Sequence, residues 1–434
     1  MSDEKETGKP DEEKKNSAPE KGFGDEIELF VKQIDALAET LPLAMIAIGR
    51  VRVTSQEQLH KFLREECKPV SHKDGMTTYR FEGGQYLKHQ RFLRRRQKAE
   101  LAMMLVPRGL LVALVSQFDA YVGALIRQLF KSRPEILDSS QKPLTLSQLI
   151  ECGSVEAAKE FVIDKEIESV LRESHNDQFN WLESKLGITL RKGLSVWPAF
   201  IELTERRNLF VHTNGVVSRQ YLEVCRRHSC QIPADIGLGD SLPITREYFG
   251  AACDCLLEIG VKLGQVIWRK IQPAEMKKAD ENLVVTTYTM LSEGRYQLAL
   301  PLLDFATETL PRLSSEDARL SCVVNRAQTY KWTGNEAKCR EILDDEDWSA
   351  TDIKFRLACA VLRDDFKHAI ELVKQIGATD RHVEKHAYRE WPLFREFRKS
   401  AEFAAVFQEV FGEQLNTLVV KSKAEGDLST ERPN

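Results

Sequence analysis

The sequence predicts an all-α protein, and three observations support that prediction. Apolar residues recur at intervals of three and four over most of the chain, as on the buried face of an amphipathic helix. The alternation of side chains that is typical of a β-strand stands out only near residues 76–82. The chain has 434 residues, of which 42% are hydrophobic and 29% charged, so it is long enough for two or three globular domains.

The first part of the chain is expected to be a disordered tail followed by a mostly helical extension over residues 23–94. Residues 1–22 carry almost no apolar side chains and cannot bury enough surface to offset the entropy lost on ordering. Apolar spacing from residue 25 to residue 48 predicts an amphipathic helix, which Pro42 breaks or kinks. A second, short helix is expected to begin near residue 54.

The β signal lies at residues 76–82, where Thr, Tyr and Phe alternate between two turn sequences, Asp74-Gly75 and Gly83-Gly84. This pattern predicts a lone strand or a small hairpin. Helical spacing resumes at residue 85 and continues to residue 131, with a kink expected near Pro107.

Residues 95–272 are expected to form one helical domain. An irregular segment is expected over residues 132–145. Apolar spacing and capping residues then predict helices at 145–150, 154–185, 198–213, 218–228 and 245–270.

Residues 275–415 carry a different pattern, which begins with Gly294-Arg295-Tyr296-Gln297-Leu298-Ala299 and leads to Pro311. This pattern resembles a tetratricopeptide (TPR) hairpin, in which small residues let two antiparallel helices approach and proline ends the second. Weaker echoes of it begin at Gly334 and Asp364.

The resemblance implies a short TPR-like α-solenoid that presents a groove to a protein partner. An aromatic-rich helix pair at 389–412 is expected to cap it, and residues 416–434 are expected to be a disordered tail. The alternative is a structural appendage that packs on the preceding domain.

The helix predicted at 198–213 has clear start and stop signals. Trp197-Pro198 indicates its start, because proline is favoured at the first helical position. Asn214-Gly215 indicates its end, because glycine readily adopts the left-handed conformation that terminates helices. The polar face of this helix is expected to carry Glu202, Glu205 and Arg206.

Three residues in the last turns of that helix, Arg207, Asn208 and His212, suggest chemistry. At about 100° per residue, Asn208 and His212 lie about 40° apart around the axis, whereas Arg207 and His212 lie about 140° apart. Either the Arg207 side chain wraps round the helix, or the two groups converge across a two-fold interface with a second copy, and we favour the interface. The alternative is a solvated helix face without chemistry.

The string Arg207-Asn208-x-x-x-His212, with Asn214-Gly215 and Tyr221 beyond it, resembles the motif of the HEPN (higher eukaryote and prokaryote nucleotide-binding) domains. The apolar helix at residues 110–122 is similar to the first core helix of that family. The resemblance extends over about residues 95–270. HEPN domains form an all-helical superfamily in which many members are metal-independent ribonucleases of defence, toxin or stress systems.

The resemblance implies an endoribonuclease that works as a homodimer without metal or cofactor. Carried over to this sequence, His212 is the general acid or base, Arg207 binds the scissile phosphate, and Asn208 orients the histidine or the phosphate. Such a site cleaves RNA by attack of the ribose 2′-hydroxyl on the adjacent phosphorus. Because many HEPN domains lack nuclease activity, the alternative is a catalytically inactive module for dimerisation or nucleotide binding, with TPR-like recruitment of partners.

A basic cluster precedes the HEPN-like region. The net charge of −4 gives the whole chain no attraction to polyanions, so contact with RNA needs a local cationic surface. Residues 88–98 contain six cations and no acid. The candidate RNA-binding residues are Arg91, Arg94, Arg95, Arg96 and Lys98. The alternative is a solvated helix face, or cations that pair with acids elsewhere.

Two groups of metal-ligand residue types do not have the spacing of known metal sites. Those groups are Cys225, His228 and Cys230 with Cys253 and Cys255, and His382 with His386. We therefore expect no metal site, and we interpret the cysteines as buried apolar residues and the histidine pair as a surface face. No phosphate-binding glycine loop or dinucleotide motif occurs, which argues against an enzyme driven by ATP or NAD.

The nine scattered cysteines and the lack of an apolar leader indicate a reducing compartment, so we expect a cytoplasmic protein. Pro107 and Arg108 interrupt the most apolar stretch, and we therefore expect no membrane span.

Overall fold

A computed structural model describes residues 21–139, 144–379 and 383–415 of the chain, and these residues are almost entirely helical. The predicted all-α class is confirmed. The chain divides into two compact units, the first ending at Pro273 and the second beginning at Ala274. Apart from Lys21 and Gly22, both expected tails lie outside the described residues.

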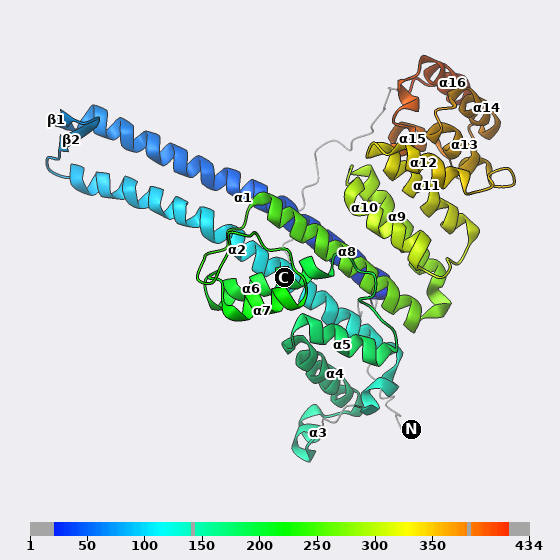
Figure 1. Cartoon of the computed structure of the whole chain (residues 1–434), viewed down its shortest axis with the longest axis horizontal. Coiled ribbons are helices and arrows are strands. Elements are labelled where there is room, and N and C mark those ends of the chain that lie inside the picture. The colour runs from blue at the N-terminus through cyan, green and yellow to red at the C-terminus, as the bar shows by residue number, and fades with distance from the viewer. Residues whose placement is uncertain (1–20, 140–143, 380–382, 416–434) are drawn as a thin grey trace, which may run out of the picture. The chain divides into compact units, whose positions relative to one another are not determined.

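Two long helices, α1 (Phe23–Glu66) and α2 (Gln85–Ser132), run side by side in opposite directions in the first unit (Figure 1). At their far end the strands β1 (Lys68–Lys73) and β2 (Met76–Arg80) form an antiparallel hairpin, as the alternating sequence predicted. Asp74 and Gly75 connect the strands with φ values of 54° and 75°. Positive φ at both turn positions matches the twist of the strands, which explains the Asp-Gly sequence.

Of the break or kink expected at Pro42, the break does not occur, because α1 continues through Pro42 to Glu66. The expectation of a second helix that begins near residue 54 is wrong, because these residues belong to α1. The helix α2 likewise runs without interruption through Pro107. A proline inside a helix costs about 3 kcal/mol. Packing of α1 against α2 offsets that cost here. Leu41, next to Pro42 in α1, and Leu111, about one turn after Pro107 in α2, are both buried.

The helix α8 (Arg246–Ile271) packs against both long helices through two glycines. The Tyr121 hydroxyl donates a hydrogen bond of 3.0 Å to the Gly260 carbonyl, and the Phe30 and Tyr121 rings stack with centroids 4.2 Å apart. A Cβ atom on Gly264 would lie 2.2 Å from the Tyr121 hydroxyl oxygen. This close approach fixes the three-helix core on which the site is built.

The remaining helices of the first unit are α3 (Leu146–Cys152), α4 (Val155–Arg172), α5 (His175–Leu186), α6 (Trp197–His212) and α7 (Arg219–Arg227). They match the predicted ranges except that the helix expected at 154–185 is divided into α4 and α5. The cause is Ser174, whose side chain accepts a hydrogen bond from the Asp177 amide and caps a new helix.

The second unit contains three consecutive helical hairpins. They are α9 (Met276–Ser292) with α10 (Tyr296–Asp304), α11 (Glu316–Trp332) with α12 (Glu336–Asp344), and α13 (Ile353–Leu362) with α14 (Phe366–Ile376). The turns contain Gly294, Gly334 and Asp364, with φ values of 74°, 85° and 58°. These are the positions at which the repeat pattern was found in the sequence.

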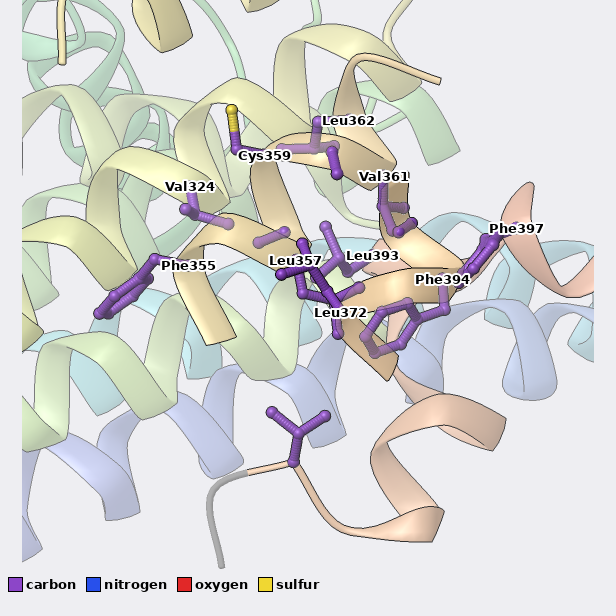
Figure 2. Close-up of a cluster of buried hydrophobic side chains, with 14 of the residues drawn as sticks. Val324, Phe355, Leu357, Cys359, Val361, Leu362, Leu372, Leu393, Phe394 and Phe397 are labelled. Atoms are coloured by element: carbon purple, nitrogen blue, oxygen red, sulfur yellow. The ribbon is translucent and has the colours of Figure 1, made fainter. Parts of the chain in front are cut away.

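The helix pair expected at 389–412 is absent among the described residues of that range. The chain forms the short helix α15 (Lys385–Glu390), two 3-10 turns and the helix α16 (Ala401–Phe411) instead. The aromatic residues of this segment complete a buried cluster with Leu357 and Leu372 (Figure 2). Phe394, Phe397, Phe403 and Phe407 are each at most 1% exposed.

The helix α2 is long and apolar enough to cross a membrane by length and composition alone, although the expectation from the sequence was that no segment is. This finding does not decide whether a span exists. The evidence for a span is weak, because core helices pass the same test. Leu114, Phe118 and Leu125 of this helix are completely buried within the first unit.

Candidate functional site

The helix that carries the Arg-Asn-x-x-x-His motif is α6, and its ends agree with the sequence signals. Proline occupies its first turn, and the chain leaves the helix after His212. Asn214 and Gly215 both have positive φ, 54° and 83°. A Cβ atom on Gly215 would lie 2.5 Å from the Phe210 ring, so both the backbone and the space require glycine there.

Glu202 and Arg206 form a buried ion pair within α6, and Glu202 also connects this helix to α7 and α8. The Arg206 Nε atom lies 2.7 Å from Glu202 Oε1, and both side chains are 7% exposed. Tyr221 and Tyr248 donate hydrogen bonds of 2.6 and 2.7 Å to the two oxygens of the Glu202 carboxylate. The expectation that Glu202 and Arg206 lie on the polar face is therefore wrong, because α7 and α8 supply partners that let both charges be buried.

Arg207, Asn208 and His212 line one cavity of about 600 Å³. The cavity lies within a single chain, so the Arg207 side chain reaches the same space as His212 despite their angular separation on the helix. Other residues that line it are Glu205 on α6, His175 at the start of α5, and Ser218, which caps α7. The structure thus brings together the three residues of the predicted site.

Asp119 on α2 connects Arg207 to a histidine that the sequence did not single out. Arg207 Nη2 donates a hydrogen bond of 3.1 Å to Asp119 Oδ2, and His175 Nε2 lies 2.8 Å from Asp119 Oδ1. The side chains of Arg207 and Asp119 are 22% and 24% exposed, and that of His175 is 6% exposed. An acid within the apolar stretch 110–122 was a signal for Asp119, whereas no sequence signal marked His175.

Glu205 also lines the cavity, and the sequence placed it only on the polar face of the helix. Asn208 Nδ2 donates to its Oε1 at 3.4 Å, which is a long hydrogen bond. Burial raises the pKa of Glu205, while the nearby His175, Asn208 and Arg207 lower it by a smaller amount. The carboxyl group therefore keeps its proton to a higher pH than an exposed glutamate does.

The predicted basic cluster lies on the first half of α2. Arg91, Arg94, Arg95 and Lys98 are exposed, and no ion pair involves them within the part of the chain that the structure describes. Arg96 instead pairs with Glu100, its Nε atom 3.4 Å from Oε1. Lys88, the first of the six cations, pairs with Glu66 at 2.6 Å. Pairing with acids is the alternative that the sequence left open, and it applies to these two cations.

Arg108 links the basic helix to the end of α6. Its Nη1 atom donates to the carbonyl and the side-chain oxygen of Asn214, both at 3.1 Å. The cluster from Arg91 to Lys98 lies 10 to 17 residues before Arg108, which corresponds to about 15–25 Å along the helix. The exposed cations therefore lie about 15–25 Å along α2 from the residue that contacts the end of α6.

Cys225, Cys253 and Cys255 are buried, as their interpretation as apolar residues requires. Within the described residues, no group of three or more His, Cys, Asp or Glu is arranged to hold a metal ion. His386 is exposed, and His382 lies outside the described residues.

Comparisons with protein-family models, curated proteins and solved structures gave no match to this chain. The function is therefore argued from the site itself.

Proposed function

We propose that this protein is a metal-independent endoribonuclease of the HEPN type, with Arg207, Asn208 and His212 as its catalytic residues. The observation that carries the proposal is that Arg207 and His212 line one cavity of about 600 Å³. Pockets for small ligands measure about 300–1,000 Å³, so a nucleotide unit of RNA fits the volume.

The residue types match the requirements of RNA cleavage. A general base removes the proton of the ribose 2′-hydroxyl, the oxygen attacks the adjacent phosphorus, and a general acid protonates the departing 5′-oxygen. His212, exposed at the end of α6, is placed to exchange protons with a bound strand. Arg207 keeps its positive charge at all relevant pH values and can stabilise the phosphorane.

The Asp119 carboxylate supports the role of Arg207, because it fixes one edge of the guanidinium. Nη2 of Arg207 binds Asp119, and Nε is buried. The N–H groups of Nη1 therefore remain to bind a phosphate. A guanidinium held in place loses less side-chain entropy when the substrate binds.

We propose that RNA reaches the cavity along the basic half of α2. Between Gly49 and Glu100 the chain has thirteen Lys and Arg against six Asp and Glu, although the whole chain carries a net charge of −4. Local excess of positive charge attracts the phosphate backbone without regard to sequence.

We propose that the active form is a homodimer. Leu101, Met104 and Leu105 are 46–50% exposed on α2, one to two turns before Arg108, and Val211 beside His212 is 51% exposed. An apolar surface next to the motif favours contact with a second copy.

The TPR-like hairpins are proposed to recruit a protein partner. We assign the protein to the cytoplasm, because none of the nine cysteines is in a disulfide, and infer a defence or stress effector from the motif.

A second candidate is an inactive nucleotide-binding module, and the Arg207–Asp119 pair favours it. An arginine already neutralised by a carboxylate at 3.1 Å stabilises a transition state less than a free one. The two candidates share the cavity and differ in whether the bound strand is cut.

Incubation of the purified protein with total RNA and a chelator distinguishes them. The nuclease leaves fragments with 2′,3′-cyclic phosphate ends, and His212→Ala abolishes them while the fold is kept. His386→Ala, which removes an exposed histidine from the second unit, is the matched control. Full cleavage by the folded His212→Ala variant would contradict the proposed mechanism, and intact RNA with the natural protein would favour the inactive module.

A further inference from the structure

We propose that Glu205 is the second proton-transfer group of this cavity, so that a single chain holds both the acid and the base for RNA cleavage. The inference rests on the proposed function and identifies the partner of His212. Without it, the acid and base roles must be divided between the histidines of two subunits.

The positions of Glu205 and His212 on α6 carry the argument. They are seven residues apart, which is about 20° short of two full turns, so they share one face of the helix at about 10 Å along its axis. Asn208 lies between them on the same face and donates to Glu205 at 3.4 Å. All three residues line the cavity. A strand that lies along this face therefore meets both titratable groups, with Asn208 between them.

Three carboxylates lie at or beside the cavity. Glu173 is exposed to solvent, whereas Asp119 and Glu205 are partly buried and differ in their freedom to carry a proton. Asp119 accepts from Arg207 and pairs with His175, so both of its oxygens are occupied. Glu205 is in no ion pair among those found in the described residues, and its one side-chain hydrogen bond is long. The proton-carrying role accordingly falls to Glu205.

The surroundings of Glu205 suit a general acid. Its carboxyl is partly buried on α6, and burial raises its pKa. The groups that face it from α5 and from its own helix are His175 and Arg207, and both oppose that rise. The other charged residues around the cavity are Arg172, Glu173 and His212. An acid with a raised pKa keeps a larger protonated fraction near neutral pH, where it can donate.

The step balances as follows. His212 takes the proton of the 2′-hydroxyl as the bond between the 2′-oxygen and phosphorus forms. The bond between phosphorus and the 5′-oxygen breaks, and Glu205 gives its proton to that oxygen. The products are a 2′,3′-cyclic phosphate and a 5′-hydroxyl, and the enzyme returns to its starting state when the proton passes from His212 to Glu205 through water.

The first test is the pH dependence of kcat/KM for Glu205→Gln against the natural protein, with a short single-stranded RNA and chelator. Activity of the natural protein falls as the pH rises through the pKa of Glu205, because the acid loses its proton. The variant loses that descending limb and is about 10²- to 10⁴-fold slower at the optimum. Glu223→Gln, an exposed acid on α7, is the matched control and keeps the natural profile.

A second measurement does not depend on cleavage. Binding of cytidine 3′-monophosphate is followed by calorimetry over the same pH range. Ionised Glu205 repels the phosphate, so affinity falls across its titration in the natural protein and in Glu223→Gln, but not in Glu205→Gln.

The outcomes separate the two claims. Cleavage by the natural protein with an unchanged profile in Glu205→Gln overturns the role of Glu205 and leaves the nuclease intact. If the natural protein cleaves no RNA, the proposed function fails, and the binding titration still decides whether Glu205 carries a proton beside the phosphate. Identical titrations in all three proteins overturn the inference.

Discussion

Arg207 donates a hydrogen bond from Nη2 to Oδ2 of Asp119 at 3.1 Å, across 88 residues of sequence. The contact joins α6, which carries the motif, to α2, which carries the basic cluster. His175 binds the other oxygen of the same carboxylate. One acid therefore positions the cationic group of the proposed nuclease and ties it to a third helix.

The Asp119 contact leads to the first prediction, for Asp119→Asn. The amide keeps the shape of the carboxylate but removes the charge that holds Arg207, so we expect RNA cleavage to fall at least tenfold while the protein stays folded. Asp119→Ala also leaves Arg207 and His175 without an acceptor, and we expect it to lower the free energy of unfolding by about 1–3 kcal/mol. Cleavage rates test the prediction for Asp119→Asn, and urea unfolding tests the prediction for Asp119→Ala. Glu57→Gln, an exposed acid on α1, serves as the control, and equal behaviour of Asp119→Asn and Glu57→Gln would be inconsistent with a positioning role.

The second prediction concerns dimers that contain one Arg207→Ala subunit and one His212→Ala subunit. Because Arg207 and His212 line a cavity of one chain, a preparation that combines Arg207→Ala and His212→Ala protomers is expected to remain inactive. Light scattering first establishes that both variants dimerise and exchange. Recovery of a substantial fraction of the natural activity would mean that the two groups act across the subunit contact instead.

The basic half of α2 gives the third prediction. Replacement of the exposed residues Arg91, Arg94 and Arg95 by Gln is expected to weaken binding of single-stranded RNA. The slope of log affinity against log salt is negative, and its magnitude should decrease by about 0.7 for each phosphate that the variant no longer binds. The rate at saturating RNA should change little, since the cluster lies away from the cavity. Lys367→Gln on α14 is the control. An unchanged salt slope in the triple variant would remove the cluster from the RNA path.

The fourth prediction concerns Gly264 of α8. A Cβ atom there would lie 2.2 Å from the Tyr121 hydroxyl and 2.7 Å from Ile27, so Gly264→Ala is expected to destabilise the first unit by about 1–3 kcal/mol. Gly250→Ala on the same helix meets open space and should be neutral or stabilise by up to about 1 kcal/mol. Thermal unfolding compares the pair. Equal stability of the two variants would show that the three-helix core is less closely packed than described.

Much of the local structure could be predicted from the sequence, because its signals act over a few residues. The Asp74-Gly75 turn specified the hairpin, and Trp197-Pro198 with Asn214-Gly215 specified both ends of α6. The periodicity of apolar residues predicted the all-α class. Where a local signal had to be weighed against packing, prediction was less successful: α1 continues through Pro42 because α2 lies along it, so the second helix expected near residue 54 is absent.

The candidate site divides in the same way. Arg207, Asn208 and His212 could be selected from their order in one helix, but their arrangement could not, since helical geometry alone placed Arg207 and His212 about 140° apart. Asp119, which binds Arg207, and His175, which binds Asp119, lie on other helices, 88 and 32 residues from Arg207. Only the packing of α2 and α5 with α6 brings these three side chains together. The burial of Glu202 and Arg206 was decided in the same way, because a charge can leave water only where distant residues supply its partners.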